Sequence, residues 1–389
     1  MIHKKERILF VGPYPPPYAG PEASMKCLLE SPLTERFDVS FLNTNFRTSN
    51  PQRGVIDLSL VRAFFVFIQR LAFRLVSHRP KVVYAFVTAT RLGWLGRDVW
   101  CIALSRLFGA HVVIHMRAGH FRRNFEGGGR LARTIIRIAC SLLSHGIVQS
   151  YSLRDQFAGL LPDHRVLSIY NAIDTDTYCD DRSRPYNPVM VLFIGHLARS
   201  KGYCDLLKVM PEIVQHYPRV EFHFAGTLVK QERNVTCNQI TGEPLGPEDP
   251  EECFDRFIRG RYEDNYVYHG MADEELKLAL LKKCALFVLP SYSEGFSMAV
   301  LEALSMGKPV VCTPVGALGE VVRPEVNGLV CMPGDLDGLR QSILRMLGDT
   351  DLMEQIGKRN ATYVRETFSV EVISRQLGDC FDSAIKGEV

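Results

Sequence analysis

The chain has 389 residues, of which 46% are hydrophobic and 23% charged, the composition of an ordinary globular enzyme. This length exceeds what one ordinary core holds, so we expect two domains. The formal net charge of +3 lacks the strong basic excess that nucleic-acid-binding proteins usually carry, so no nucleic-acid partner is expected.

The cysteines and the start of the chain bear on the compartment. None of the eleven cysteines forms a Cys-x-x-Cys pair, and several lie in apolar runs, where a reduced thiol packs as a small core side chain. No secretory leader precedes the first apolar run, and no run of about 18 uncharged apolar residues could span a bilayer. We therefore expect a cytoplasmic protein and leave open a peripheral position on the inner face of the membrane.

Short apolar runs of strand length recur through the first half of the chain. They are Arg7–Val11, Val39–Leu42, Val82–Phe86, Val112–His115 and Gly146–Gln149. Helical stretches such as Asp98–Leu107 and Leu131–Leu143 separate them. This alternation predicts a parallel sheet that is covered by helices on both faces.

The same pattern begins again in the second half, with runs at Val189–Ile194, Val220–Ala225, Leu286–Leu289, Val310–Cys312 and Gly328–Val330. The polar stretch Asp180–Pro188 is the expected linker. We predict an α/β protein of two Rossmann-like domains facing each other across a cleft, residues 1–180 and 181–365, with a final helix over 366–389 that crosses back to the first domain. The segment 227–260 lacks a clear period, and we leave it open as an insertion over the cleft mouth or a solvated surface excursion.

The loop after Leu286–Leu289 is the strongest candidate for chemistry, because ligands of open α/β sheets bind at the carboxyl ends of the strands. Glu294 lies in this loop and Glu302 in the helix that follows, which Ser297 is expected to cap and Gly307 to end. Gly295 permits a close approach of a ligand to the backbone, and free N–H groups at the helix start suit a diphosphate. From spacing alone, both carboxylates could equally be solvated surface groups.

A second loop, Gly195–Gly202, also follows a strand end and places Arg199 and Lys201 before a helix that begins at Tyr203. Cations beside backbone N–H groups suit a pyrophosphate whose charge grows as a nucleotide departs. These side chains could otherwise be ordinary surface charges, and for Arg199 the two interpretations are evenly balanced.

The pattern Glu294-Gly-Phe…Glu302-Ala, followed by Gly307-Lys-Pro-Val-Val, resembles the Glu-x7-Glu signature of retaining glycosyltransferases of family 4, which have the GT-B fold. The resemblance extends to Tyr170-Asn-Ala-Ile-Asp174, Thr313-Pro-Val-Gly316, Glu320 and Asn327-Gly-Leu-Val330. It implies that Glu302 holds the ribose of a nucleotide and that Glu294 contacts the transferred sugar. The donor contacts that it implies are Gly20, Arg199, Lys201, Glu294, Gly295, Phe296, Ser297, Met298 and Glu302.

The resemblance also implies catalytic roles for His115, Glu294 and Lys201, with His115 near the transferred sugar and His120 as a weaker candidate. Two departures from the family pattern are visible. His196 stands where the family usually has an arginine, which Arg199 could replace, and only Gly20 matches the family's Gly-Gly pair in the first loop. No metal and no cofactor are expected, although Asp174-Thr-Asp176 has the form of a metal-binding Asp-x-Asp.

The implied activity is transfer of a sugar from a nucleotide-diphosphate donor to a glycan or a lipid-linked acceptor, in cell-surface polysaccharide or glycolipid synthesis. A nucleotide-sugar epimerase on the same scaffold and a non-catalytic nucleotide-sugar-binding protein are the alternatives. The stretch 62–81 holds five basic residues, no acidic residue and several phenylalanines, and 117–137 adds six arginines against Glu126 alone. Such stretches suit an anionic membrane surface or a lipid-diphosphate acceptor, or else a buried helix with a solvated edge.

Overall fold

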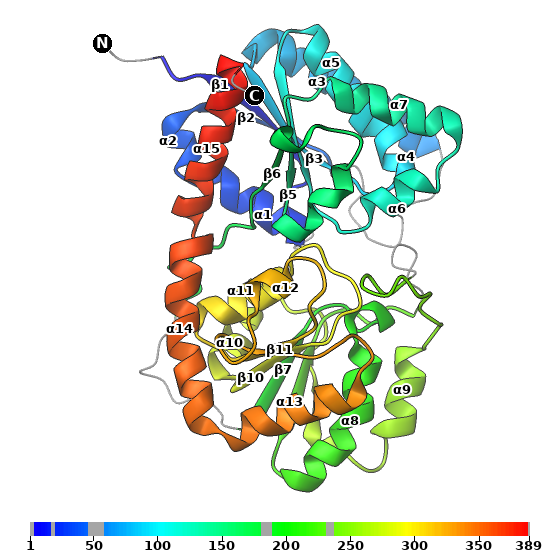
Figure 1. Ribbon diagram of the computed structural model, residues 1–389, viewed down its shortest axis with the longest axis vertical. Helices are drawn as coiled ribbons and strands as arrows, with labels where there is room; N and C mark the ends of the chain where they lie inside the picture. The colour runs from blue at the N-terminus through cyan, green and yellow to red at the C-terminus, as the bar shows by residue number, and fades with distance from the viewer. Residues whose placement is uncertain (1–3, 17–19, 46–57, 180–188, 231–236, 388–389) are drawn as a thin grey trace. The chain divides into compact units, whose positions relative to one another are not determined.

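The computed structural model describes residues 4–16, 20–45, 58–179, 189–230 and 237–387. The chain forms two compact units (Figure 1). Unit 1 comprises residues 1–172 and 368–389, and unit 2 comprises residues 173–367. The expected linker Asp180–Pro188 lies outside the described residues, so the predicted domain limits remain a prediction.

Unit 1 contains a six-stranded sheet in the order β2-β1-β3-β4-β5-β6, in which every neighbouring pair is parallel. The strands are β1 (Arg7–Gly12), β2 (Asp38–Asn43), β3 (Val82–Val87), β4 (His111–Met116), β5 (His145–Val148) and β6 (Val166–Ser168). The parallel sheet expected from the apolar runs is therefore confirmed. The sequence missed only β6, because this short edge strand is only partly buried and does not form an apolar run in the sequence.

Helices cover both faces of this sheet. They are α1 (Gly20–Leu29), α2 (Leu33–Arg36), α3 (Leu58–His78), α4 (Arg91–Gly93), α5 (Val99–Leu107), α6 (Phe121–Glu126), α7 (Arg130–Ser141) and α15 (Val370–Lys386), with a π turn at Trp94–Asp98 and 3-10 turns at Tyr151–Phe157 and Asp163–Arg165. Alternate residues of β1 enter different cores, since Ile8 and Phe10 pack with α1, α2 and α15 whereas Leu9 and Val11 pack with α3 and α5.

The last helix, α15, is an integral part of unit 1. Its buried residues Leu377 and Phe381 lie in the same core as Phe10 of β1, and the Phe381 ring is 5.8 Å from that of Phe37. Arg36 of α2 also pairs with Asp379, with 3.0 Å between Nη2 and Oδ1. Residues from the beginning and from the end of the chain thus form one core.

Unit 2 repeats this plan with the strand order β12-β11-β10-β7-β8-β9, again parallel throughout. The strands are β7 (Met190–Ile194), β8 (Glu221–Ala225), β9 (Tyr266–Tyr268), β10 (Leu286–Leu289), β11 (Val310–Cys312) and β12 (Leu329–Val330). The central strands are buried on both sides, which explains why their sequences read as continuous apolar runs. The short strand β9, also partly buried at the sheet edge, was not predicted from the sequence for the same reason as β6.

The helices of unit 2 are α8 (Tyr203–His216), α9 (Pro250–Phe257), α10 (Glu274–Lys283), α11 (Met298–Ser305), α12 (Leu318–Val321), α13 (Leu336–Gly348) and α14 (Thr350–Phe368), with 3-10 turns at Arg199–Lys201 and Glu263–Asn265. Among the residues that the structure describes, no helix is both long and apolar enough to cross a bilayer.

Candidate functional site

The strand order of unit 2 reverses direction between β7 and β10. From β7 the chain proceeds to β8 and β9 on one side, and from β10 it proceeds to β11 and β12 on the other. The loops after β7 and β10 therefore leave the sheet as neighbours, at the topological switch point where open α/β sheets bind ligands. Lys201 follows β7 and Glu294 follows β10, and the Lys201 Nζ atom lies 2.7 Å from Glu294 Oε1. Two candidates from distant parts of the sequence thus meet at this point.

Two glycines hold these loops close together. Gly202 has a φ of 71°, and a Cβ added to it would lie 2.0 Å from the carbonyl oxygen of Pro290. Gly316 has a φ of 56°, and its Cβ would lie 2.4 Å from the carbonyl oxygens of both Glu294 and Gly295. A side chain at either position would combine backbone strain with a clash against the loop 290–297, so the geometry around Glu294 requires glycine at both.

Glu294 is held from three sides. The Ser291 hydroxyl donates to Oε1 at 2.7 Å, alongside the Lys201 ammonium, and the backbone N–H of Glu294 donates to Gln239 Oε1 at 3.0 Å. The Glu294 side chain is buried, with 8% of the residue exposed. A buried carboxylate is stable only when it is paired and hydrogen-bonded, and these contacts meet that requirement.

The helix start expected after this loop is confirmed. Ser297 is the N-cap of α11 and its hydroxyl accepts from the Val300 N–H at 3.5 Å, while Gly307 follows the helix end with a φ of 65°. Gly295 and Phe296 lie in the loop, Met298 is the first residue of the helix, and Phe296 is buried. The positive end of the helix dipole therefore lies within a few residues of Glu294.

Glu302 lies on α11 and is nearly inaccessible, with 4% of the residue exposed. Its Oε1 atom is 2.7 Å from the Nζ of Lys277 on α10, and the Lys277 ammonium also lies 5.2 Å from the centre of the Tyr178 ring. Burial raises the pKa of Glu302, although the charge of Lys277 partly opposes this shift. Burial would lower the pKa of Lys277, but the charge of Glu302 outweighs that effect and the pKa of Lys277 is raised. The contact distance is that of a charged pair, and we take both groups as ionised at neutral pH.

Arg199 lies in the loop after β7 but is engaged by acidic residues. Its guanidinium contacts Asp205 Oδ1 at 2.9 Å and Glu248 Oε2 at 2.9 Å, and it stacks over the Tyr292 ring at 4.2 Å. Burial alone would lower the pKa of Arg199, but Asp205 and its other neighbours raise it. An arginine in such a network supports the loop, so a phosphate would have to displace existing partners to reach it.

The segment 227–260 was expected to be either an insertion or a solvated excursion, and its described part packs on the candidate site. Beyond the Gln239 contact with Glu294, the Gln239 N–H donates to the Tyr292 carbonyl at 2.9 Å. Glu248 of the same segment accepts from Lys208 at 2.5 Å as well as pairing with Arg199. The segment therefore shapes the loops after β7 and β10 and is not merely solvated.

One group of potential metal ligands is found within the described ranges: the ligand atoms of Cys204, Glu248 and Cys253 lie within 4.8 Å of one another. Glu248 already neutralises two cations, Arg199 and Lys208, which weakens its attraction for a metal ion. The Asp-x-Asp motif at Asp174 has a structural explanation. Asp174 accepts from Thr177 Oγ1 at 2.6 Å and from the N–H of Asp176 at 3.0 Å, closing a local turn.

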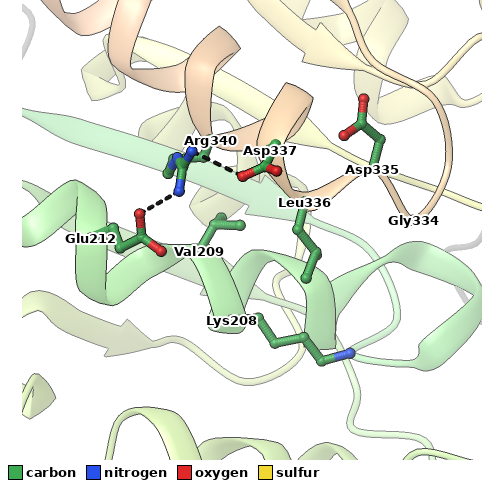
Figure 2. Close-up of a pocket in the computed structure, with 8 residues that line it drawn as sticks. All are labelled: Lys208, Val209, Glu212, Gly334, Asp335, Leu336, Asp337 and Arg340. Carbon is green, nitrogen blue, oxygen red and sulfur yellow. Dashed lines mark hydrogen bonds and ion pairs between the residues drawn. The ribbon is translucent and has the colours of Figure 1, made fainter.

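A cavity of about 470 Å³ lies between α8 and the start of α13 (Figure 2). Arg340 lines it and pairs with Glu212 and, at 2.9 Å, with Asp337. Lys201, Glu294 and Glu302 do not line this cavity, which is distinct from the loops at the switch point. Its lining charges largely pair with one another, and we assign no role to it.

Unit 1 carries the remaining candidates. His115 lies in β4 with 1% of the residue exposed, and its Nδ1 atom is 2.7 Å from the Tyr84 hydroxyl. Burial raises the pKa of Tyr84 and holds that of His115 well below its usual value, so a protonated phenol donates to a neutral imidazole. The ring proton then resides on Nε2, which has no partner among the described residues. His120 precedes α6 and makes no capping bond, and Gly20 begins α1.

The fold and these loops define the class of protein. Two parallel six-stranded Rossmann-like sheets make up the GT-B fold of glycosyltransferases. A solved sucrose-phosphate synthase from Thermosynechococcus elongatus matches with a TM-score of 0.75 and 18% identity, over 99% of this chain and 100% of that one. The Anabaena protein HepE, solved with UDP-glucose, matches with a TM-score of 0.68 and 19% identity, over 97% of this chain and 99% of that one. At such identities, the likeness shows the fold.

Sequence comparisons identify the family of the second half of the chain. Residues 175–362 match the family model of glycosyl transferases group 1. The glycogen synthase of Mycobacterium tuberculosis is 25% identical over 325 residues, which cover 80% of this chain and 71% of that protein. Residues 175–362 belong to the group 1 glycosyltransferases, the retaining enzymes of family 4, and the resemblance seen in the motifs of this chain is confirmed.

Three residues of the candidate site were not predicted from the sequence. Lys277 lies in an ordinary-looking helix, and nothing in its spacing points to Glu302. Gln239 lies in a segment without a period, and Tyr178 lies just before the expected linker. None of them belongs to the motifs that carry the family resemblance, so only the fold could bring them to the two glutamates.

Proposed function

We propose that this glycosyltransferase moves a sugar from a nucleotide-diphosphate donor to a glycan or a lipid-linked acceptor, in the synthesis of a cell-surface polysaccharide or glycolipid. The observation that carries the donor side is the contact between Lys201 and Glu294 at the switch point of unit 2. A cation and a carboxylate side by side suit a ligand that joins a diphosphate to a polyhydroxylated sugar.

We assign the pyrophosphate to Lys201, with help from the backbone of Gly295–Met298 at the start of α11. An ammonium group has three N–H donors, so the contact with Glu294 leaves two for phosphate oxygens. Charge gathers on these oxygens as the glycosidic bond to phosphate breaks, and a fixed cation stabilises that change more than it stabilises the intact donor. Arg199 supports the loop in this assignment and Gly20 remains a further candidate near the phosphates.

We assign the two glutamates to different parts of the donor. Glu294 accepts hydrogen bonds from hydroxyls of the transferred sugar and stabilises positive charge at its anomeric carbon. Glu302, kept ionised by Lys277, accepts from the ribose hydroxyls. Hydrogen bonds to a charged acceptor contribute about 1.5–3 kcal/mol each, so either contact would noticeably affect binding or rate.

Retention in this proposal follows front-side attack, in which the departing phosphate takes the proton of the acceptor hydroxyl. We assign His115 a hydrogen bond to the transferred sugar, because the N–H of its neutral ring at Nε2 has no partner among the described residues. The protein thus contributes orientation and charge stabilisation. The product's anomeric configuration, determined by NMR, tests this scheme, and inversion relative to the donor would exclude it. We further propose that no metal takes part, so the rate should be unchanged in excess EDTA.

A thermal-shift panel of UDP, GDP, ADP and their sugars tests the donor assignment. UDP-glucose leads the panel because the similar Anabaena protein was solved with it. A ligand at about 100 times its Kd stabilises the fold by about 2.7 kcal/mol, which a melting curve resolves. Stabilisation by a nucleotide diphosphate that Lys201→Ala abolishes supports the proposal, and no response to any member of the panel would refute it.

A further inference from the structure

Three neighbouring helices of unit 1 expose large apolar side chains to solvent. Helix α5 contacts both α3 and α7, and the three share one face of the sheet, since α3 and α5 pack on Val83 and Ala85 while α5 and α7 pack on alternate residues of β4 (Figure 1). We call their outward side the α3–α5–α7 face. Its exposed apolar residues include Phe65, Phe73, Trp100, Leu131 and Ile138, which are 50–75% exposed.

The arrangement on each helix is regular. On α3, the inward side buries Phe67, Leu71 and Leu75, yet Phe65 and Phe73 still point outward with 65% and 67% of each residue exposed. The alternative of a buried helix with a merely solvated edge therefore does not describe α3. A core helix normally exposes polar residues on its outer side, so two exposed phenylalanines on one helix call for an explanation.

The exposed apolar groups of α3 and α5 are continuous at the surface. The Phe64 ring lies 5.5 Å from that of Phe65 and 6.0 Å from that of Trp100 on α5, which links the two helices at the surface. On α7, Leu131 and Ile138 share one side at helical spacing, and both they and Leu142, which caps the end of the helix, are exposed. Exposed apolar side chains are thus present on all three helices of the α3–α5–α7 face.

The charge of this face has one sign. The sequences of α3, α5 and α7 contain no aspartate or glutamate, and their exposed basic residues include Arg62, Arg70, Arg74, Arg106 and Arg137. A second copy of this chain would bring these arginines against one another, which disfavours self-association through the face. Anionic lipid headgroups complement the arginines, and the outer acyl region of the same bilayer complements the aromatic and aliphatic side chains.

We propose that the α3–α5–α7 face docks unit 1 on an anionic bilayer. This inference rests on the proposed lipid-linked acceptor, because an enzyme docked on the bilayer encounters such an acceptor by diffusion in the plane of the membrane. The docking itself requires only unit 1 and no donor chemistry. Vesicle binding measured without donor, and donor binding measured without vesicles, can therefore fail separately.

Cosedimentation of the full chain with vesicles at 100 mM salt tests the inference. Binding is expected to vesicles of phosphatidylcholine with phosphatidylglycerol, and much less to phosphatidylcholine alone. Each arginine replaced by glutamine should weaken binding about fivefold, so Arg70→Gln/Arg74→Gln should lose about 25-fold. Phe65→Ser/Phe73→Ser should lose a similar factor, since each ring leaves contact with the acyl region. Raising the salt to 500 mM should weaken the wild type more than the arginine variant.

Met271→Ser/Met332→Ser is the matched control, because both methionines are exposed but belong to unit 2. The control should bind as the wild type does, and unchanged circular dichroism melts of all variants establish that they fold. Lack of wild-type binding to the anionic vesicles would overturn the inference. Vesicle binding that none of the face variants weakens would also overturn it. A wild-type dimer in sedimentation analysis that becomes a monomer in the phenylalanine variant would do the same.

Discussion

The pair formed by Lys277 and Glu302 offers the sharpest test of the candidate site. Replacing Lys277 by methionine keeps most of the side-chain volume but leaves the Glu302 carboxylate, only 4% exposed, without its cation. At 2.7 Å, the gross attraction is roughly 6 kcal/mol for an effective dielectric constant of about 20, much of it offset by desolvation. Removing one partner of such a buried pair usually costs about 3–5 kcal/mol.

Unit 2 spans 195 residues, 173–367, so a loss of about 3 kcal/mol should lower its melting temperature by about 6–12 °C. Calorimetry of the full chain would resolve this shift. Burial already raises the pKa of Glu302, and loss of Lys277 would raise it further until the carboxyl group is partly protonated. A protonated Glu302 accepts fewer hydrogen bonds from ribose, so nucleotide affinity measured by isothermal calorimetry should fall about tenfold or more.

The double variant Lys277→Met/Glu302→Gln distinguishes the two effects. It removes both charges, so it should recover most of the melting temperature while nucleotide affinity stays low. Lys358→Met, at an exposed lysine of α14, serves as the control and should change neither quantity. A wild-type melting temperature together with a wild-type affinity in Lys277→Met alone would refute the proposed role of this pair.

Three further predictions follow from the site. Glu302→Ala should mainly weaken donor binding, whereas Glu294→Ala should mainly lower kcat, both read from steady-state kinetics with varied donor. Gln239→Ala removes the acceptor of the Glu294 N–H, and the loss of one neutral hydrogen bond should reduce kcat/KM about fivefold with little change in unfolding temperature. Burial holds the pKa of His115 below its ordinary 6.5, so the unfolded chain binds a proton that the folded chain does not, and stability falls as the pH drops below about 6.5. His115→Gln should therefore reduce this acid-side loss, which amounts to at most about 1.4 kcal/mol per pH unit, in melts between pH 7 and 5.

Each of these predictions has a result that would contradict it. Equal losses of kcat and donor affinity in both glutamate variants would contradict the assignment of Glu294 to the sugar and Glu302 to the ribose. A Gln239 variant with wild-type kinetics would mean that the Glu294 N–H is satisfied equally well by water. For His115, an unchanged acid slope would assign the pH dependence to other buried histidines such as His145, whose pKa burial also lowers.

Much of the fold was predictable because its signals are local. A strand buried on both faces must be apolar throughout, so runs such as Leu286–Leu289 mark the strands directly. The start of α11 was also predictable from the sequence, because a serine that caps a helix acts within one turn of its own position. The edge strands Val166–Ser168 and Tyr266–Tyr268 gave no such signal, because they are only partly buried and pairing with a neighbour defines them.

What the tertiary structure decided was which charges meet. From the sequence, Arg199 could be either a phosphate contact or an ordinary surface charge, whereas the fold pairs it with Asp205 and Glu248. Gln239 reaches the backbone of Glu294 across 55 residues, and Lys277 reaches Glu302 across 25. Such contacts depend on the directions of separate elements, which local sequence does not encode.

The sequence alone therefore determined the alternating strands and helices and the family motif around Glu294 and Glu302, because both rest on residues close together in the chain. The tertiary structure alone decided that Lys201 lies against Glu294, since that contact joins two loops at the point where the strand order reverses. It also decided that Phe65 and Phe73 face solvent, because only packing determines which side of an apolar helix is left uncovered.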